Sequence, residues 1–211
     1  MTEKIIPHIG TDESGKGDFF GPLVIAGVLV DERAAKIFTD LGIKDSKKLS
    51  DKKMLAMAVE IKKNAPHSVI AISNGKYNEL YSNIKNLNKL LAWGHARAIE
   101  NILNSSSCEY VLSDKFGDES LIKNALMKNG QSIRLEQMVR AESDIAVAAA
   151  SVLARATFVQ KMQDMENNYG LKFPKGCSGL VKTAASEFIQ KYGKDRLHEV
   201  CKTHFKTFNE V

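Results

Sequence analysis

Short apolar segments alternate with longer amphipathic segments along the chain. Five of the apolar segments have the length and the β-branched content of strands, and they cover residues 5–11, 23–30, 68–73, 109–113 and 132–138. The second segment is apolar at nearly every position, which is the pattern of a strand covered on both faces. The link between the first two segments is short and contains glycine and proline, so it predicts a hairpin.

The segments between and after these strands have the apolar spacing of helices. They cover residues 31–41, 77–103, 118–128, 142–167 and 178–192, and a further helix opens at Ser50, which is suited to an N-cap. Interleaved strands and helices followed by a helical C-terminal region predict an α/β fold with a mixed central sheet flanked by helices. No repeat, low-complexity tract or long linker divides the sequence, so we expect residues 1–211 to form a single domain.

Composition narrows the class of protein without assigning a function. Hydrophobic residues make up 44% of the chain and charged residues 26%, which is typical of a soluble globular protein. The formal net charge of +5 favours a polyanionic partner but is weak evidence alone. Cys108, Cys177 and Cys201 form no CxxC pair, which is typical of a reducing cytoplasm. Cys201 and His204 lack the second pair of ligands that structural zinc needs.

The sequence shows no signal for export or for membrane insertion. The amino terminus lacks the charged-then-apolar pattern of a signal peptide. The longest apolar stretches, residues 24–30 and 145–154, are shorter than the ~20 residues that a membrane helix needs. We therefore expect a soluble, cytoplasmic protein, and because no feature implies a protein partner we expect a monomer.

Residues 9–22, with the sequence IGTDESGKGDFFGP, combine two kinds of chemistry. Asp12 and Glu13 are adjacent acids, and Gly15, Lys16 and Gly17 follow them closely. Carboxylates bind hard cations, whereas glycine backbone and lysine suit a phosphate. Consecutive strand residues point to opposite faces, so both acids can serve one site only where the strand ends, which the glycines favour. The segment predicts metal-assisted chemistry on a phosphodiester.

Two further acids are candidates for the same site. Asp114 follows an apolar strand, at the end where ligands gather in open α/β sheets. Glu142 is expected in the first turn of a long helix, where the helix dipole favours a carboxylate by ~0.3–1 kcal/mol. Each also has an ordinary interpretation, as a turn residue or a helix-start acid, and Asp118 and Asp144 are their rivals. Glu142 and Asp144 would lie about 200° apart around a helix, so only one of them can face the site.

Four converging carboxylates would repel one another unless cations lay between them. At ~4 Å and an effective dielectric constant of ~20, each pair repels by about 4 kcal/mol. Oxygen ligands alone favour Mg²⁺ or Mn²⁺ over zinc.

Residues 10–17 nearly match the P-loop pattern GxxxxGK[ST]. However, Gly17 stands where that pattern has a hydroxyl for Mg²⁺, and two acids would lie inside a loop that must hold phosphates. Phe-Phe-Gly-Pro follows where a P-loop requires a helix. We therefore reject a nucleoside triphosphatase.

The densest basic cluster lies at residues 44–53 and includes Lys47 and Lys48. It is either a solvated face or, beside a metal site, a contact for a phosphate backbone.

Taken together, these motifs resemble those of the type 2 ribonucleases H and are closest to ribonuclease HIII. The opening motif is DESGKGDFFGP at residues 12–22. Further matches follow in the same order: DSKKL at 45–49, YNEL at 77–80, NLNKLLAWGHARA at 86–98, DKF at 114–116, RAES at 140–143, FPKG at 173–176 and HF at 204–205. The resemblance covers nearly the whole chain.

This resemblance implies a ribonuclease H-like fold and an endonuclease that cuts the RNA strand of RNA–DNA hybrids, leaving 5′-phosphate and 3′-hydroxyl ends. It implies two divalent ions, Mg²⁺ or Mn²⁺, held by four catalytic acids, which are Asp12, Glu13, Asp114 and Glu142. It also implies a turn that contacts ribose 2′-hydroxyls and phosphate, formed by Ser14, Gly15, Lys16 and Gly17. Beside such a site, Lys47 and Lys48 would bind the substrate backbone.

Two departures from the family leave alternatives open. Ribonuclease HIII usually has an additional amino-terminal domain that grips the hybrid, whereas the catalytic motif here begins within the first dozen residues. Hybrid affinity is then expected from the lysines and the helical C-terminal region. Ribonuclease HII normally has Gly-Arg-Gly where this chain has Gly15-Lys16-Gly17, so cleavage at single embedded ribonucleotides is an alternative. A hybrid-binding protein that does not cut is an alternative from another class, although a pure polyanion binder gains nothing from clustered acids.

Overall fold

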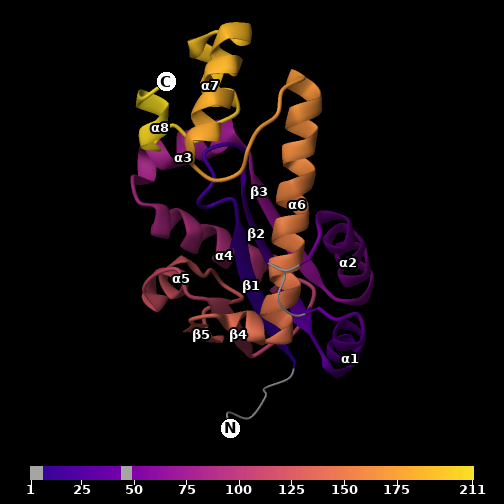
Figure 1. Cartoon of the computed structure of the whole chain (residues 1–211). Coiled ribbons are helices and arrows are strands. Elements are labelled where there is room, and N and C mark those ends of the chain that lie inside the picture. Colours follow the sequence, from indigo (N-terminus) through magenta and orange to yellow (C-terminus); the bar gives the residue numbers. More distant parts are fainter. Residues whose placement is uncertain (1–6, 44–48) are drawn as a thin grey trace.

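The computed structural model describes residues 7–43 and 49–211 (Figure 1). Five strands form one sheet: β1 (His8–Ser14), β2 (Leu23–Val30), β3 (His67–Ile72), β4 (Tyr110–Asp114) and β5 (Arg134–Met138). Their order is β3-β2-β1-β4-β5; β2 runs antiparallel to β1 and β3, and β4 runs parallel to β1 and β5. The mixed sheet expected from the sequence is confirmed.

Helices cover both faces of this sheet (Figure 1). One face carries α1 (Glu32–Asp40), α2 (Asp51–Asn64) and the long α6 (Ile145–Tyr169). The other face carries α3 (Asn74–Ile84), α4 (Leu87–Leu103) and α5 (Glu119–Ala125). The C-terminal region contains α7 (Gly179–Tyr192), the 3-10 helix η3 (Lys194–Glu199) and the short α8 (Lys206–Asn209), and it lies beyond the sheet beside the far half of α6.

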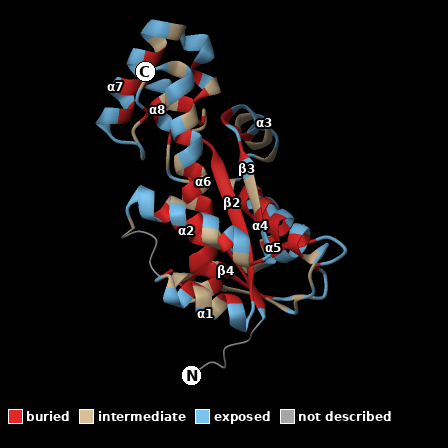
Figure 2. Ribbon diagram, turned by 90° about the vertical axis from the view of Figure 1, so that its right-hand side faces the viewer, coloured by how far each residue is buried: buried red, intermediate tan, exposed pale blue. Residues whose placement is uncertain are grey.

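β2 shows why the sheet needs helices on both sides. All of its residues are buried, and its side chains alternate between the two layers. Val24, Ala26 and Val28 pack with α2 and α6, whereas Leu23 and Ile25 pack with α3 and α4. In Figure 2 the strand is buried along its length, while α1 and α2 expose their outer faces. The unbroken apolar pattern of this strand is therefore explained by burial on both faces.

Two glycines allow helices to approach the sheet very closely. A Cβ atom on Gly10 of β1 would lie 2.1 Å from the carbonyl carbon of Ala146 in α6. A Cβ atom on Gly94 of α4 would lie 2.6 Å from the Cδ1 atom of Ile25 in β2. These contacts bring α6 and α4 against opposite sides of the central strands.

Two expected element boundaries are wrong. The expected helical stretch 77–103 is two helices, because Lys85 adopts the left-handed conformation with φ of 50° and Asn86 caps α4 by accepting from the Lys89 backbone N–H at 3.1 Å. β1 does not end at Thr11 but continues through the two acids to Ser14. The acids therefore belong to the strand itself rather than to the turn after it.

By length and composition, α6 is the one helix in the described ranges that could cross a membrane. However, 67% of its most apolar window is buried inside the protein. It therefore has the environment of a core helix, and the apolar stretch 145–154 noted from the sequence is its first ten residues.

Candidate active site

The carboxyl ends of two parallel strands bring Asp12 and Asp114 together. β1 pairs with β4 so that Thr11 lies opposite Ser113, and each strand continues directly into an acid. A cavity of about 360 Å³ opens at this edge. It is lined by Asp12, Glu13, Ser14, Gly15, Lys16, Gly17, Asp18, Asp114, Glu142, Ser151, Arg155, Phe158, Val159 and Lys175. The four acids singled out in the sequence thus line one cavity, together with the whole Ser14–Gly17 turn.

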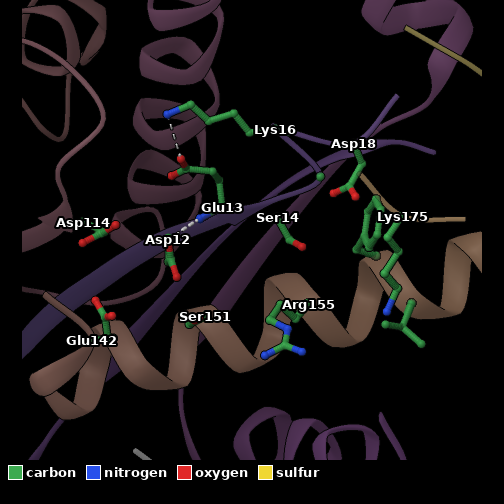
Figure 3. Close-up of a pocket in the computed structure, with 14 residues that line it drawn as sticks. Asp12, Glu13, Ser14, Lys16, Asp18, Asp114, Glu142, Ser151, Arg155 and Lys175 are labelled. Atoms are coloured by element: carbon green, nitrogen blue, oxygen red, sulfur yellow. Dashed lines mark hydrogen bonds and ion pairs between the residues drawn. The ribbon is translucent and has the colours of Figure 1, made fainter. Parts of the chain in front are cut away.

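Asp12 and Glu13 leave β1 on opposite sides, as consecutive strand residues must (Figure 3). Asp12 points towards α6, where the Ser151 side chain hydrogen-bonds to it, and its Oδ1 atom accepts the Glu13 backbone N–H at 2.8 Å. Glu13 points towards α4, and its Oε2 atom lies 3.2 Å from Nε2 of His95. Both acids reach the cavity because the strand ends one residue later.

Glu142 lies in the 3-10 helix η2 (Ala141–Ser143), so its expected place in the first turn of α6 is wrong. The physical reason is Asp144, which caps α6 by accepting from the backbone N–H groups of Ala146 and Val147 at 2.9 and 3.1 Å. Asp144 also contacts Nε2 of His8 at 2.9 Å and does not line the cavity. Of the two rivals, Glu142 is the one that faces the site.

η2 is fastened to the end of β4, which holds Glu142 near the other acids. The Oδ1 atom of Asp114 accepts the backbone N–H of Ala141 at 3.0 Å. Asp118, the rival of Asp114, instead caps α5 by accepting the Ser120 N–H at 2.8 Å. Asp118 does not line the cavity.

The two neighbouring acids of β1 have opposite electrostatic environments. Burial, followed by the charge of Glu13 and then of Asp114, raises the pKa of Asp12 to about 7, despite hydrogen bonds from Ser151 and the Glu13 backbone. Burial also acts to raise the pKa of Glu13, but contacts with His95 and Lys16 outweigh it, and the pKa is lowered. Of these two acids, Asp12 is therefore the one that needs a cation to stay ionised at neutral pH.

The turn after β1 has a backbone shape that only glycine adopts easily. Gly15 has φ of +87°, and a Cβ atom there would lie 2.2 Å from the carbonyl oxygen of Pro22. Lys16 places its Nζ atom 3.5 Å from Oε1 of Glu13 and 5.9 Å from the ring centroid of Phe116. Gly17 is exposed and has open space around it. The turn therefore presents backbone and one cation at the rim of the cavity.

The segment after this turn is tied to the C-terminal region. Lys202 is fully buried, and its Nζ atom donates to the carbonyl oxygens of Asp18 and Gly21 at 2.8 and 2.7 Å. The Asp18 carboxylate accepts the Gly176 N–H at 2.6 Å. These contacts hold the segment after the turn against the C-terminal region.

Sequence reasoning missed two cations of the cavity, Arg155 and Lys175. Arg155 lies on α6, one turn beyond Ser151, and Lys175 lies in the loop before α7. The FPKG match at 173–176 was a signal for Lys175, whereas Arg155 lies within an alanine-rich helix whose pattern indicates only packing. Lys47 and Lys48, expected to contact substrate, lie outside the described residues.

The donor atoms around the cavity fit hard divalent cations. The acids supply only carboxylate oxygens, which suit Mg²⁺ and Mn²⁺. Within residues 7–43 and 49–211, no three His, Cys, Asp or Glu side chains are already grouped closely enough to hold a metal ion. The carboxylates therefore surround the cavity without forming a closed cage, and the raised pKa of Asp12 is consistent with a site that needs positive charge.

Comparison with known proteins gives one consistent family. A family model described as Ribonuclease HII matches residues 9–208. Ribonuclease HIII of Protochlamydia amoebophila is 45% identical over 207 residues, which are 98% of this chain and 69% of that protein. Ribonuclease HIII of Chlamydia felis is 48% identical over 208 residues, covering 97% of this chain and 69% of that protein.

Solved structures agree with these sequence matches. The crystal structure of Bst-RNase HIII in complex with Mn²⁺ has a TM-score of 0.89 and 31% identity, and the match covers 97% of this chain and 68% of that one. RNase H3 of Aquifex aeolicus has a TM-score of 0.78 and 30% identity, with 95% of this chain and 72% of that chain covered. The expected ribonuclease H-like fold is confirmed.

Proposed function

Because the chain belongs to the type 2 ribonuclease H family, that of ribonucleases HII and HIII, we propose that it cuts the RNA strand of RNA–DNA hybrids using divalent metal ions. One observation carries this proposal. Asp12, Glu13, Asp114 and Glu142, which are distant in sequence, line one cavity directly beside a glycine turn that presents a lysine. Carboxylates that hold cations, beside a turn that holds phosphate, suit metal-ion hydrolysis of a phosphodiester.

The four acids have distinct roles in this proposal. Two divalent ions, Mg²⁺ or Mn²⁺, would activate a water and stabilise the charge that develops on the scissile phosphate. Asp12 feels the charge of both Glu13 and Asp114, and it would contribute ligands to both ions. Glu13 and Asp114 would supply further ligands to one ion, and Glu142, on the separate element η2, would hold the other ion or orient the water. The ends produced are a 5′-phosphate and a 3′-hydroxyl.

The Ser14–Gly17 turn would select the RNA strand. Its glycine backbone allows a sugar to approach closely, and the Ser14 side chain faces the cavity (Figure 3). A 2′-hydroxyl is the group that distinguishes ribose from deoxyribose, so contacts at this turn would spare the DNA strand. Lys16, Arg155 and Lys175 add positive charge along the same cavity, where they would contact phosphates.

The decisive experiment incubates end-labelled RNA–DNA hybrid with the protein and Mg²⁺ or Mn²⁺. We expect internal cuts in the RNA strand only, loss of cutting in EDTA, and loss of cutting by Asp12→Asn while hybrid binding is kept. If the unaltered chain bound the hybrid but did not cut it, the protein would be a hybrid-binding protein and not an enzyme. Full activity of Asp12→Asn in EDTA would contradict catalysis by metal ions.

Cleavage at single embedded ribonucleotides is a second candidate, because the matching family model is that of ribonuclease HII. We favour longer hybrids, since Lys16 lacks the planar fork of arginine that ribonuclease HII has there. Two duplexes, one with a ribonucleotide run and one with a single ribonucleotide, separate the candidates. Equal cutting of both would remove our preference.

We further propose that residues 1–211 act as one domain, as a monomer, in the cytoplasm. One hydrophobic cluster extends from β2 and α2 through α6 to α7 and Cys201, which supports a single folding unit. Cys108, Cys177 and Cys201 are all free thiols, as a reducing compartment would keep them. Gel filtration with light scattering would test the monomer.

A further inference from the structure

His95 of α4 is buried directly beneath the candidate active site. Its side chain has no solvent exposure, and it contacts both central parallel strands. Its Nδ1 atom lies 2.9 Å from Oγ1 of Thr11 and 3.5 Å from Oγ of Ser113, which are the residues just before Asp12 and Asp114. Its Nε2 atom lies 3.2 Å from Oε2 of Glu13.

The chemistry of these partners fixes which ring nitrogen donates. An ionised carboxylate can only accept, so Nε2 of His95 carries the proton that it donates to Glu13. In the neutral imidazole Nδ1 is then an acceptor, and the Thr11 hydroxyl can donate to it. Thr11, His95 and Glu13 therefore form a directed chain of hydrogen bonds that ends on one carboxylate oxygen.

The fold holds this ring with little freedom. Gly94 lets α4 approach β2 closely, because any side chain there would collide with Ile25, and this places His95 against the sheet. The ring of Phe116 stacks on His95 with centroids 4.8 Å apart and planes inclined by 23°. Both ring nitrogens have partners, and one face of the ring is covered.

Glu13 is the acid of the site that most needs such support. It leaves β1 on the α4 side, opposite to Asp12, so its carboxylate must be turned to face the cavity (Figure 3). His95 engages Oε2, whereas Oε1 faces Lys16 at 3.5 Å. Lys16 is partly exposed, so the buried imidazole is the firmer of the two contacts.

We propose that His95 is a positioning residue that holds the Glu13 carboxylate in the orientation needed to bind a divalent cation. This inference rests on the proposed function. A partner that orients a metal ligand in this way typically changes metal affinity by 10–100-fold when it is removed. A histidine serving only as core filling would have no effect on cation affinity beyond its effect on stability.

Two matched substitutions separate the contacts of the ring. The amide of His95→Gln can take the place of Nε2 and reach Glu13, whereas that of His95→Asn can take the place of Nδ1 and reach only Thr11. Mn²⁺ affinity is measured by calorimetry without nucleic acid, and thermal unfolding is measured in EDTA. We expect His95→Asn to bind Mn²⁺ about 10–100-fold more weakly, and His95→Gln to stay closer to the unaltered protein.

A double substitution tests whether His95 acts through Glu13. In a Glu13→Gln background, adding His95→Asn should not weaken Mn²⁺ binding further, because the coupled contact is already lost. Unchanged Mn²⁺ affinity in His95→Asn, or equal losses in the Asn and Gln variants that track their unfolding temperatures, would overturn the inference.

Thr11→Val keeps the inference testable if His95→Asn does not fold. It removes only the hydroxyl that anchors Nδ1, and we expect Mn²⁺ binding to weaken several-fold; unchanged binding would count against the proposal. Measurements on the unaltered protein distinguish failure of the proposed function from failure of the role of His95. If it neither binds Mn²⁺ nor cuts hybrid, the proposed function fails; if it does both and the variants match it, only the role of His95 fails.

Discussion

Asp12 and Glu13 show how far one position along a strand changes the behaviour of a carboxylate. The two residues share a backbone and a cavity, yet the pKa of Asp12 is raised to about 7 and that of Glu13 is lowered. The difference follows from strand geometry, because one side chain faces Asp114 and buried surface while the other faces His95 and Lys16. The site therefore combines an acid that resists ionisation with one that is already held as an anion.

Asp12 should destabilise the metal-free protein as the pH rises. Its pKa in the folded state lies above the ordinary value of 3.8, so the folded state holds the proton more tightly and stability falls between about pH 4 and pH 7. Asp12→Asn removes this loss and should raise the free energy of unfolding at pH 8 in EDTA by roughly 2–4 kcal/mol. Urea unfolding at pH 5 and pH 8 measures it, and parallel pH dependence in both proteins would contradict it.

Glu142→Gln should reduce hybrid cleavage by orders of magnitude while leaving stability nearly unchanged, since Glu142 is a partly exposed residue of a short 3-10 helix. Asp118→Asn is the matched comparison, because Asp118 caps α5 instead of lining the cavity. It should change neither stability nor activity much, because asparagine caps a helix about as well as aspartate. A reversed pattern would make Asp118 the fourth acid. Steady-state cleavage rates decide between them.

The acids of the candidate site could be predicted from the sequence, whereas the residues that position them could not. Three separated motifs led to the four acids, because carboxylates at strand ends follow from local pattern. The place of Glu142 in η2 was missed, since it depends on which of the two acids caps α6. Asp144 does so, and it also contacts His8, which is 136 residues away in sequence. His95 was missed because a single histidine in an apolar helix has the pattern of a core residue.

Among the elements, the contact between β1 and α6 determines the shape of the site. α6 carries Ser151 and Arg155 to the cavity, and it can lie so near β1 only because position 10 has no side chain. The unbroken apolar pattern of β2 made the cover on both faces of the sheet predictable from sequence. The break between α3 and α4 was not predictable, since Lys85 takes the left-handed conformation without a glycine or proline to announce it.

Gly10→Ala should damage both stability and cleavage. Its Cβ atom would lie 2.1 Å from the backbone of Ala146, which must move, and overpacking of this kind costs about 1–3 kcal/mol or more. Gly75→Ala is the control, because α3 leaves open space there and alanine favours a helix. We expect a lower unfolding temperature for the first variant and an equal or higher one for the second. Equal unfolding temperatures would show that α6 shifts freely.

The cavity carries both signs of charge, because Lys16, Arg155 and Lys175 line it together with the acids. If Arg155 and Lys175 contact phosphates, replacing both with alanine should lower the slope of log hybrid affinity against log salt by about 1–2. Lys36→Ala is the control, since Lys36 is exposed on α1 and does not line the cavity. Binding titrations at several salt concentrations measure the slopes. An unchanged slope would show that neither Arg155 nor Lys175 contacts phosphate.

Lys202 makes the stability of the molecule depend on pH in the alkaline range. Burial lowers its pKa from 10.5 to about 7, so the unfolded chain binds the proton more tightly and stability should rise from about pH 7 to pH 10. The rise is at most about 1.4 kcal/mol per pH unit from this group. Lys202→Met should flatten it, which urea unfolding at pH 7, 8 and 9 would reveal. An equally steep rise in the variant would show that Lys202 stays charged.

The hydrogen bonds from Lys202 to Asp18 and Gly21 also set the order in which parts of the site can form during synthesis. Asp18 and Gly21 leave the ribosome well before the lysine that holds their carbonyl oxygens, which is made 184 and 181 residues after them. A growing polypeptide can pair β1 with β2 long before that lysine exists. The segment after the glycine turn is therefore held in its final place only once residue 202 has left the ribosome.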